Sequence, residues 1–133
     1  MAKIEWAVLC DLAFFDGQDR LCIIGMFRTF PAPSLPFAIS QVMLVAKLTD
    51  IRPVEEVSIS IGVVTPRGQW IAPAQSDKVV IEPTREYVLA TVRDVPIVEE
   101  GIHSFQIALK GQSSVSVDLP VLSVERPSFA KAH

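Results

Sequence analysis

The chain has 133 residues, the length of one domain, and a chain of this size can bury a core without disulfide or metal support. Half of its residues are hydrophobic and the mean hydropathy is +0.38, so some apolar side chains are expected on the surface, where large patches mark contact sites. The net charge is −3, and none of the 12 basic residues adjoins another in the sequence, which disfavours a nucleic-acid partner.

The N-terminal residues predict neither secretion nor membrane insertion. An early Lys3 precedes an apolar run, but Glu5 and Asp11 interrupt that run and no small-residue cleavage site follows it. No stretch approaches the roughly 18 uninterrupted apolar residues of a membrane span. We therefore expect a soluble, cytoplasmic protein without a membrane partner.

An alternation of apolar and polar residues recurs along the chain and predicts antiparallel strands with one buried face, because every second side chain of a strand lies on the same side. The first two strands, residues 4–15 and 21–30, are expected to form a hairpin around Asp16-Gly17, a pair that tolerates the positive φ of a tight turn.

The register of this hairpin predicts the state of the two cysteines. The expected cross-strand partners are Gly25 or Met26 for Cys10, and Ala13 or Phe14 for Cys22. The two cysteines are then about four residues out of register, or roughly 13 Å apart, which is beyond disulfide reach. Both are expected to be buried free thiols, and no further cysteine or clustered histidine completes a zinc site.

The segment from Phe30 to Phe37 contains three prolines and is expected to be a non-strand link that crosses from one sheet to the other. The third strand follows at residues 39–49. Its uninterrupted apolar run, Val42-Met43-Leu44-Val45-Ala46, predicts burial on both faces.

The remaining strands are short and separated by turn residues. They are expected at 55–65, 87–95, 102–110 and 115–124. Residues 69–72 and 78–82 are expected to form either one interrupted strand or two short strands. Pro66-Arg67-Gly68 forms the turn after the strand at 55–65. These elements predict an all-β, antiparallel β-sandwich of about seven to eight strands, immunoglobulin-like in general architecture, with a single domain at 1–125 and a tail at 126–133.

Two residues are weighed as catalytic groups. His103 shares the inward parity of Phe105, so a structural histidine at the rim of the sandwich is favoured over a general base. Asp11 is a carboxylate within an apolar strand, where it either contacts a ligand or partner, faces solvent, or caps backbone groups. An enzyme that uses Asp11, His103 or a metal is the least favoured hypothesis, and no catalytic residue, metal or cofactor is predicted.

The remaining interface candidates are aromatic residues near turns and links. Phe30 and Phe37 flank the proline segment, and Trp70 follows Arg67 in the turn, where an edge position is expected. Together with Asp11, these four residues are the predicted binding or interface residues. The function they favour is a non-enzymatic protein-interaction or self-association module, with a homo-oligomer expected; the alternative is a sandwich that binds a small ligand or carbohydrate near residues 30–37 and 67–70.

Several segments resemble a bacterial family of small uncharacterised proteins with a domain of unknown function. The likeness is most specific in Glu5-Trp6-Ala7-Val8-Leu9-Cys10-Asp11-Leu12-Ala13 and in the stretch from Asp16 to Phe27, and it continues through Thr65-Pro66-Arg67-Gly68 and Gly101-Ile102-His103-Ser104-Phe105. The resemblance implies a single-domain β-sandwich. It implies no active site.

Overall fold

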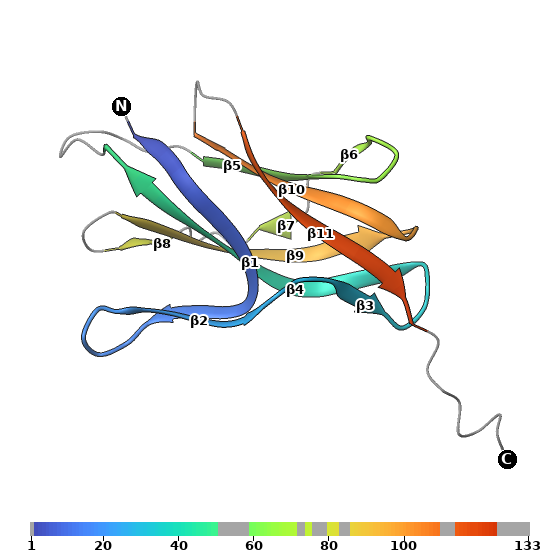
Figure 1. Cartoon of the computed structure of the whole chain (residues 1–133), viewed down its shortest axis with the longest axis horizontal. Coiled ribbons are helices and arrows are strands. Elements are labelled where there is room, and N and C mark those ends of the chain that lie inside the picture. The colour runs from blue at the N-terminus through green and yellow to red at the C-terminus, as the bar shows by residue number, and fades with distance from the viewer. Residues whose placement is uncertain are drawn as a thin grey trace, which may run out of the picture.

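The computed structural model describes residues 2–50, 59–71, 74–75, 80–82, 86–109 and 114–124. The regular elements among them are β-strands arranged in two sheets (Figure 1). Within these ranges, no helix has the length and apolar character needed to cross a membrane.

The first sheet has six strands in the order β2-β1-β4-β9-β7, and β8 also pairs with β9. The pairings are antiparallel. The strands are β1 (Lys3–Phe15), β2 (Leu21–Met26), β4 (Phe37–Thr49), β7 (Ala74–Gln75), β8 (Val80–Glu82) and β9 (Tyr87–Ile97).

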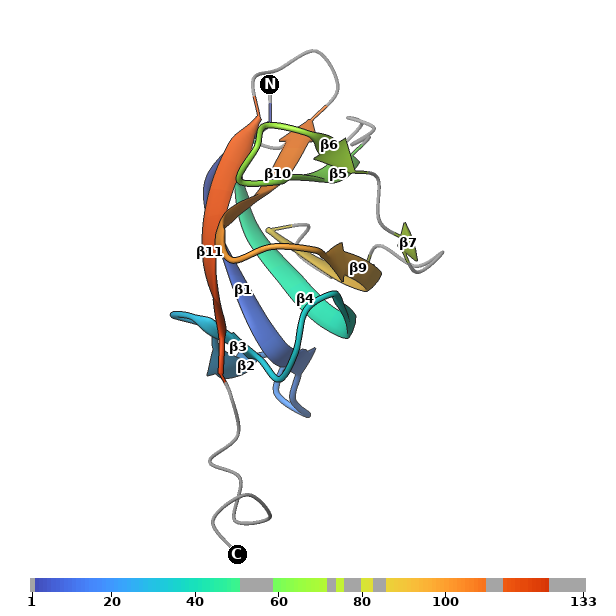
Figure 2. The same ribbon diagram turned by 90° about the vertical axis from the view of Figure 1, so that its right-hand side faces the viewer.

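The second sheet has five strands in the order β3-β11-β10-β5-β6. They are β3 (Phe30–Ala32), β5 (Ile59–Val64), β6 (Trp70–Ile71), β10 (Gly101–Leu109) and β11 (Val115–Ser123). The pairing of β3 with β11 is parallel, and the others are antiparallel. Figure 2 shows from the side how β5, β6 and β10 form one layer and β4 and β9 the other.

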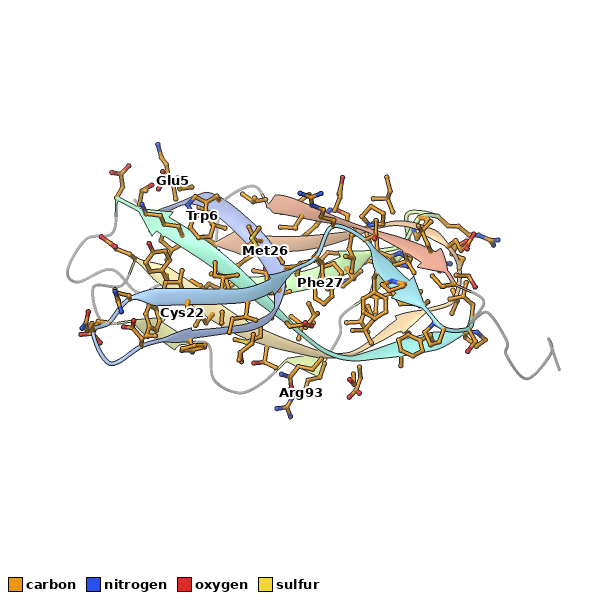
Figure 3. The ribbon with its side chains drawn as sticks, turned by 60° about the horizontal axis from the view of Figure 1, so that its bottom comes forward. Glu5, Trp6, Cys22, Met26, Phe27 and Arg93 are labelled. Carbon is orange, nitrogen blue, oxygen red and sulfur yellow. The ribbon has the colours of Figure 1, made fainter. Side chains whose placement is uncertain are left out.

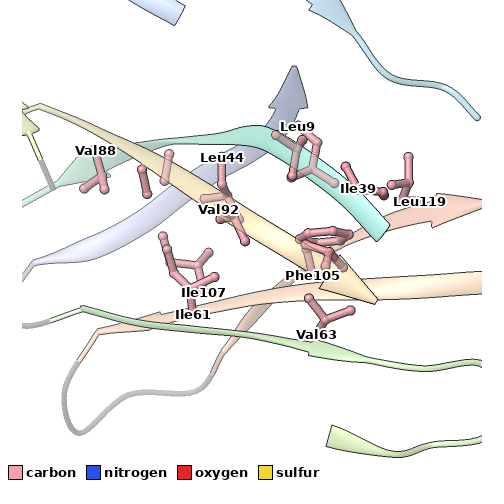
Figure 4. Close-up of a cluster of buried hydrophobic side chains, with 14 of the residues drawn as sticks. Leu9, Ile39, Leu44, Ile61, Val63, Val88, Val92, Phe105, Ile107 and Leu119 are labelled. Atoms are coloured by element: carbon pink, nitrogen blue, oxygen red, sulfur yellow. The ribbon is translucent and has the colours of Figure 1, made fainter. Parts of the chain in front are cut away.

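The main core lies between the two sheets, because alternate residues of each strand face inward. Phe105 and Ile107 of β10 are fully buried opposite Leu44 of β4 and Val92 of β9. Figure 4 shows these side chains meeting others from both sheets, among them Leu9, Ile61 and Leu119.

A second, smaller core lies on the outer face of the six-stranded sheet. Strand β1 pairs with β4 as far as Cys10 opposite Met43, and from there to Phe15 it continues with β2 as its strand partner (Figure 1). The β1–β2 hairpin lies over β4 and β9, with Cys10, Met43 and Leu89 buried beneath it. Val42 to Ala46 of β4 are therefore buried on both faces, as their apolar run predicts.

The predicted sandwich and the hairpin register are confirmed. Cys10 lies opposite Met26 and Phe14 opposite Cys22, and both cysteines are free thiols. Two expectations are wrong. Phe30–Ala32 was expected to be a non-strand link, but it forms a short strand that pairs in parallel with the edge of β11. Cys22 was expected to be buried, but it is only half-buried because it lies on the outward side of the hairpin.

The link between β3 and β4 does carry the chain from one sheet to the other, as predicted. The expected strand residues 55–58, 72 and 78–79, Lys110, and the proposed tail at 126–133 lie outside the described residues. The boundaries of the single domain and the immunoglobulin-like architecture stay predictions.

Candidate functional site

The turn between β1 and β2 is held by one carboxylate. Asp16 accepts hydrogen bonds from the backbone N–H groups of Gln18 and Arg20 at 2.8 and 3.0 Å, and from Nε of Arg20 at 2.7 Å. The backbone bonds from Arg20 and Gln18, together with the guanidinium contact, lower the pKa of Asp16. Asp19 takes the left-handed conformation with a φ of 56°, which completes the turn.

The inward face of the hairpin is apolar and fixes its position on the sheet. Ala13, Phe15, Leu21 and Ile23 all pack against the second core. The ring of Tyr87 on β9 lies between two aromatic side chains of β1, with centroid distances of 6.0 Å to Trp6 and 6.1 Å to Phe15. The backbone N–H of Ala13 also points to Sδ of Met43 at 3.2 Å. These contacts make the hairpin a packed part of the fold.

The outward face of the hairpin is apolar as well. Four large side chains of the hairpin are exposed: Leu12 at 45 %, Phe14 at 40 %, Ile24 at 52 % and Met26 at 59 %. The register places Leu12 opposite Ile24 and Phe14 opposite Cys22, so these four side chains form one continuous surface, and the exposed Met26 follows Gly25 at the end of β2. We call Leu12, Phe14, Cys22, Ile24 and Met26 the hairpin face. Figure 3 labels Cys22 and Met26 along β2, which lies in front of β1 in that view.

The two faces of the hairpin arise from a change in strand parity at Asp11. Cys10 and Ala13 both contribute to the second core although they are three residues apart, so Asp11 and Leu12 are both exposed. Opposite them, Gly25 has a φ of 71°, and a Cβ on it would lie 2.7 Å from Oδ2 of Asp11. The predicted contact residue Asp11 is thus exposed, and its side chain covers the backbone of Gly25.

Trp70, another predicted contact residue, lies on edge strand β6 and is 58 % exposed. A Cβ on Gly62 would lie 2.0 Å from Cη2 and Cζ2 of the indole and 2.7 Å from Cζ3, and such similar distances to three ring atoms place Gly62 beneath the ring face. The opposite face of the indole is the exposed one. Nε of the neighbouring Arg67 lies 2.9 Å from Oε2 of Glu99.

The predicted contact residues Phe30 and Phe37 are half-buried. The ring of Phe30 lies 5.8 Å from that of Phe27 and 5.9 Å from that of Phe37, and all three pack against the main core. Phe30 and Phe37 therefore contribute to the packing of the main core.

His103 is fully buried at the start of β10, on the inward face that its parity predicts. Its Nδ1 lies 3.2 Å from the carbonyl oxygen of Gly101, while Nε2 is buried without a hydrogen-bond partner among the described residues. Burial lowers the pKa of His103, against the smaller raising effects of Gly101 and Glu99. Asp11 and His103 form no hydrogen-bonded pair, and the described residues contain no group of three or more His, Cys, Asp or Glu side chains suited to a metal.

A comparison with known protein families identifies the family of this chain. Residues 5–122 match the family of unknown function DUF6941. The chain belongs to this family. No curated protein and no solved structure matches it. The predicted resemblance to a family of uncharacterised proteins is thus confirmed over most of the chain.

Sequence reasoning on this DUF6941 member missed the hairpin face. Its signal was present, because residues 12–15 and 21–26 hold apolar side chains at both parities, whereas a strand with one solvated face alternates. In β4 the same signal means burial between two cores, and in the hairpin it means one buried and one exposed apolar face. Only the three-dimensional position at the sheet edge separates the two cases.

Proposed function

We propose that this protein is a non-enzymatic, cytoplasmic interaction module whose contact surface is the hairpin face. One observation carries the proposal: the β1–β2 hairpin is apolar on both sides, and only the inward side is covered. An antiparallel strand with one solvated face ordinarily has polar outward residues, so an uncovered apolar face favours a partner.

The size of the hairpin face supports this function. Its four most exposed side chains leave roughly half of their surface in water, which amounts to on the order of 400 Å² if each has about 200 Å². The largest apolar patch on a monomeric protein is about 300–600 Å² and is often functional. Because the inward face is fixed on the second core, a partner would meet a surface that is already ordered.

The test compares two matched substitutions on different surfaces. Ile24 on the hairpin face is 52 % exposed and Ile102 on the other sheet is 55 % exposed, so a change to Glu is tolerated by the fold at both positions. Native mass spectrometry on the untagged protein, purified gently from its own host, should show complexes above the 14.6 kDa chain mass. Ile24→Glu should abolish these complexes and Ile102→Glu should retain them. A bare monomer in the wild type, or equal loss in both variants, would contradict the proposal.

A second candidate function is the binding of a small ligand or carbohydrate at Trp70. The exposed face of an indole that lies flat on the sheet favours it, because the apolar face of a sugar ring can stack on such a surface. Titration of oligosaccharides with heteronuclear NMR should shift the indole signal of Trp70, and Trp70→Ala should remove binding. Absence of any shift at millimolar sugar would count against this function.

A further inference from the structure

We propose that the outer face of the second sheet binds a neutral oligosaccharide whose pyranose units carry equatorial hydroxyl groups. This inference rests on the second candidate function, and it adds the class of sugar and the residues that bind it. The outer face consists of the side chains that β5, β6, β10 and β11 direct away from the main core. Among the described residues of these strands, Trp70 is the aromatic side chain that this face exposes.

Two rows of outward residues cross these strands, because residues directly opposite each other in antiparallel strands share a face. One row includes the tryptophan, and the other includes the glycine beneath its ring. Their members are Trp70, Val64, Ser104 and Asp118 in the first row, and Gly62, Gln106 and Ser116 in the second. Since the indole lies over Gly62, the next side chain along the second row is that of Gln106, on a strand about 4.8 Å away.

The indole forms an apolar platform beside this amide. Gly62 has no side chain, so one face of the ring lies against the backbone of β5 and the other face is open to solvent. In a pyranose with equatorial hydroxyls, the ring faces carry C–H groups and the hydroxyls lie at the rim, so a ring face stacks on an indole. The strand spacing of about 4.8 Å is close to the width of one pyranose ring, so the rim of a stacked unit meets Gln106.

The polar side chains of the second row match the hydroxyls of a sugar. A carboxamide both donates and accepts hydrogen bonds, as a hydroxyl does, so the amide of Gln106 suits two neighbouring hydroxyls. Oγ of Ser114 donates to Oε1 of Gln106 at 3.5 Å, which orients the amide. Ser116 and Asp118 on β11 are exposed and continue the polar surface by one more strand. A chain of several sugar units therefore meets more of this face than a single unit does.

The charge of the outer face favours a neutral ligand. Asp118 is the charged side chain that the described residues of these four strands direct outward. Arg67, in the turn after β5, lies with its Nε 2.9 Å from Oε2 of Glu99 and is already paired. Because an acidic or phosphorylated sugar needs a cation to offset its charge, and Asp118 repels it, the face suits a neutral chain.

Gly62→Ala distinguishes a stacking platform from a merely exposed tryptophan, because the new Cβ lifts the indole off the sheet and retains it. The probe is cellotetraose, a neutral chain of glucose units with equatorial hydroxyls, followed by heteronuclear NMR. The indole N–H of Trp70 and the side-chain amide of Gln106 should shift together and saturate. Gly62→Ala and Gln106→Glu should each weaken binding by about 3- to 10-fold.

Two controls accompany these variants. Ile24→Glu adds the same charge as Gln106→Glu but lies on the hairpin face, and it should bind cellotetraose as the wild type does. The matching chain of glucuronic acid units carries a carboxylate on each ring, and it should bind the wild type about 10-fold more weakly at low ionic strength. A dispersed spectrum of each variant shows that the variant is folded.

The outcomes separate this inference from both candidate functions. Cellotetraose binding that Gly62→Ala and Gln106→Glu weaken, and Ile24→Glu leaves unchanged, supports it. Equal binding of the neutral and acidic chains, or binding that Gly62→Ala leaves unchanged, overturns it and retains Trp70 as a ligand contact. No shift with either chain overturns carbohydrate binding at Trp70 altogether, whereas the hairpin face is tested independently by the complexes that Ile24→Glu should abolish.

Discussion

The contact between Gly62 and Trp70 predicts that Gly62→Ala destabilises the protein when Trp70 is present and stabilises it when Trp70 is replaced by alanine. A Cβ on Gly62 would lie 2.0 Å from two atoms of the indole ring, so Gly62→Ala forces Trp70 off the sheet. Trp70 is 58 % exposed, which leaves 42 % covered, or about 100 Å² of a side chain of roughly 250 Å². At about 25 cal/mol per Å², this cover is worth up to about 2.5 kcal/mol.

Alanine itself is favoured over glycine in a strand by about 0.5–1 kcal/mol, because glycine loses more conformational freedom on folding. Gly62→Ala alone should therefore lower the free energy of unfolding by about 1–2 kcal/mol. In a Trp70→Ala background the ring is absent, and the same substitution should raise the free energy of unfolding by roughly 0.5 kcal/mol. The coupling between the two positions is then about 2 kcal/mol.

Guanidinium unfolding followed by far-UV circular dichroism measures all four proteins of this cycle, and it avoids the fluorescence of Trp6. An Ile102→Ala variant, exposed on β10 of the same sheet, controls for a general effect of substitution on this surface. If Gly62→Ala has the same effect with and without Trp70, the indole does not lie on Gly62 and the reasoning fails.

Three further predictions concern the fold itself. Burial lowers the pKa of His103 in the folded state, so as the pH falls below about 6.5 this histidine takes up a proton in the unfolded chain before it does in the folded protein. The melting temperature should therefore drop between pH 7 and pH 5, and His103→Leu should make this drop smaller. Gly25→Ala should lower the free energy of unfolding in urea by about 1–3 kcal/mol, because φ is 71° and the new Cβ would lie 2.7 Å from Oδ2 of Asp11; an unchanged midpoint would contradict this. Phe105→Ala should cost about 3–5 kcal/mol in the same assay, since Phe105 is fully buried in the main core.

Much of the fold could be predicted because strand parity and turn chemistry are local. The alternation from His103 to Leu109 predicts the inward face of β10, and Asp16-Gly17 predicts the hairpin turn. The pairing of β3 with β11 could not be found in this way, because it joins Phe30 to Val121 across the length of the chain. The immunoglobulin-like architecture stays a prediction that the order β1-β4-β9 opposite β11-β10-β5 supports, since it matches the ABE and GFC strands of that fold.

The candidate site was harder to predict than the fold, because exposure depends on which surfaces remain uncovered after packing. Aromatic type alone favoured Phe30 and Phe37, but these rings pack with Phe27 against the main core. Trp70 was correctly placed at an edge, since a turn and a glycine on the neighbouring strand leave its ring room to lie flat.

The hairpin face depends on the parity change at Asp11. The position of Asp11 in the strand can thus be described without a catalytic role or a direct contact with a partner. If β1 kept a single parity beyond Cys10, Leu12 and Phe14 would be directed into the second core, and Ala13 and Phe15 would be directed outward. Asp11 lies beside Gly25 at the point where the order reverses, and a Cβ at position 25 would lie 2.7 Å from its carboxylate oxygen Oδ2. The carboxylate in the apolar strand therefore lies where the parity of β1 changes, and beyond this point Leu12 and Phe14 of the proposed contact surface are directed outward.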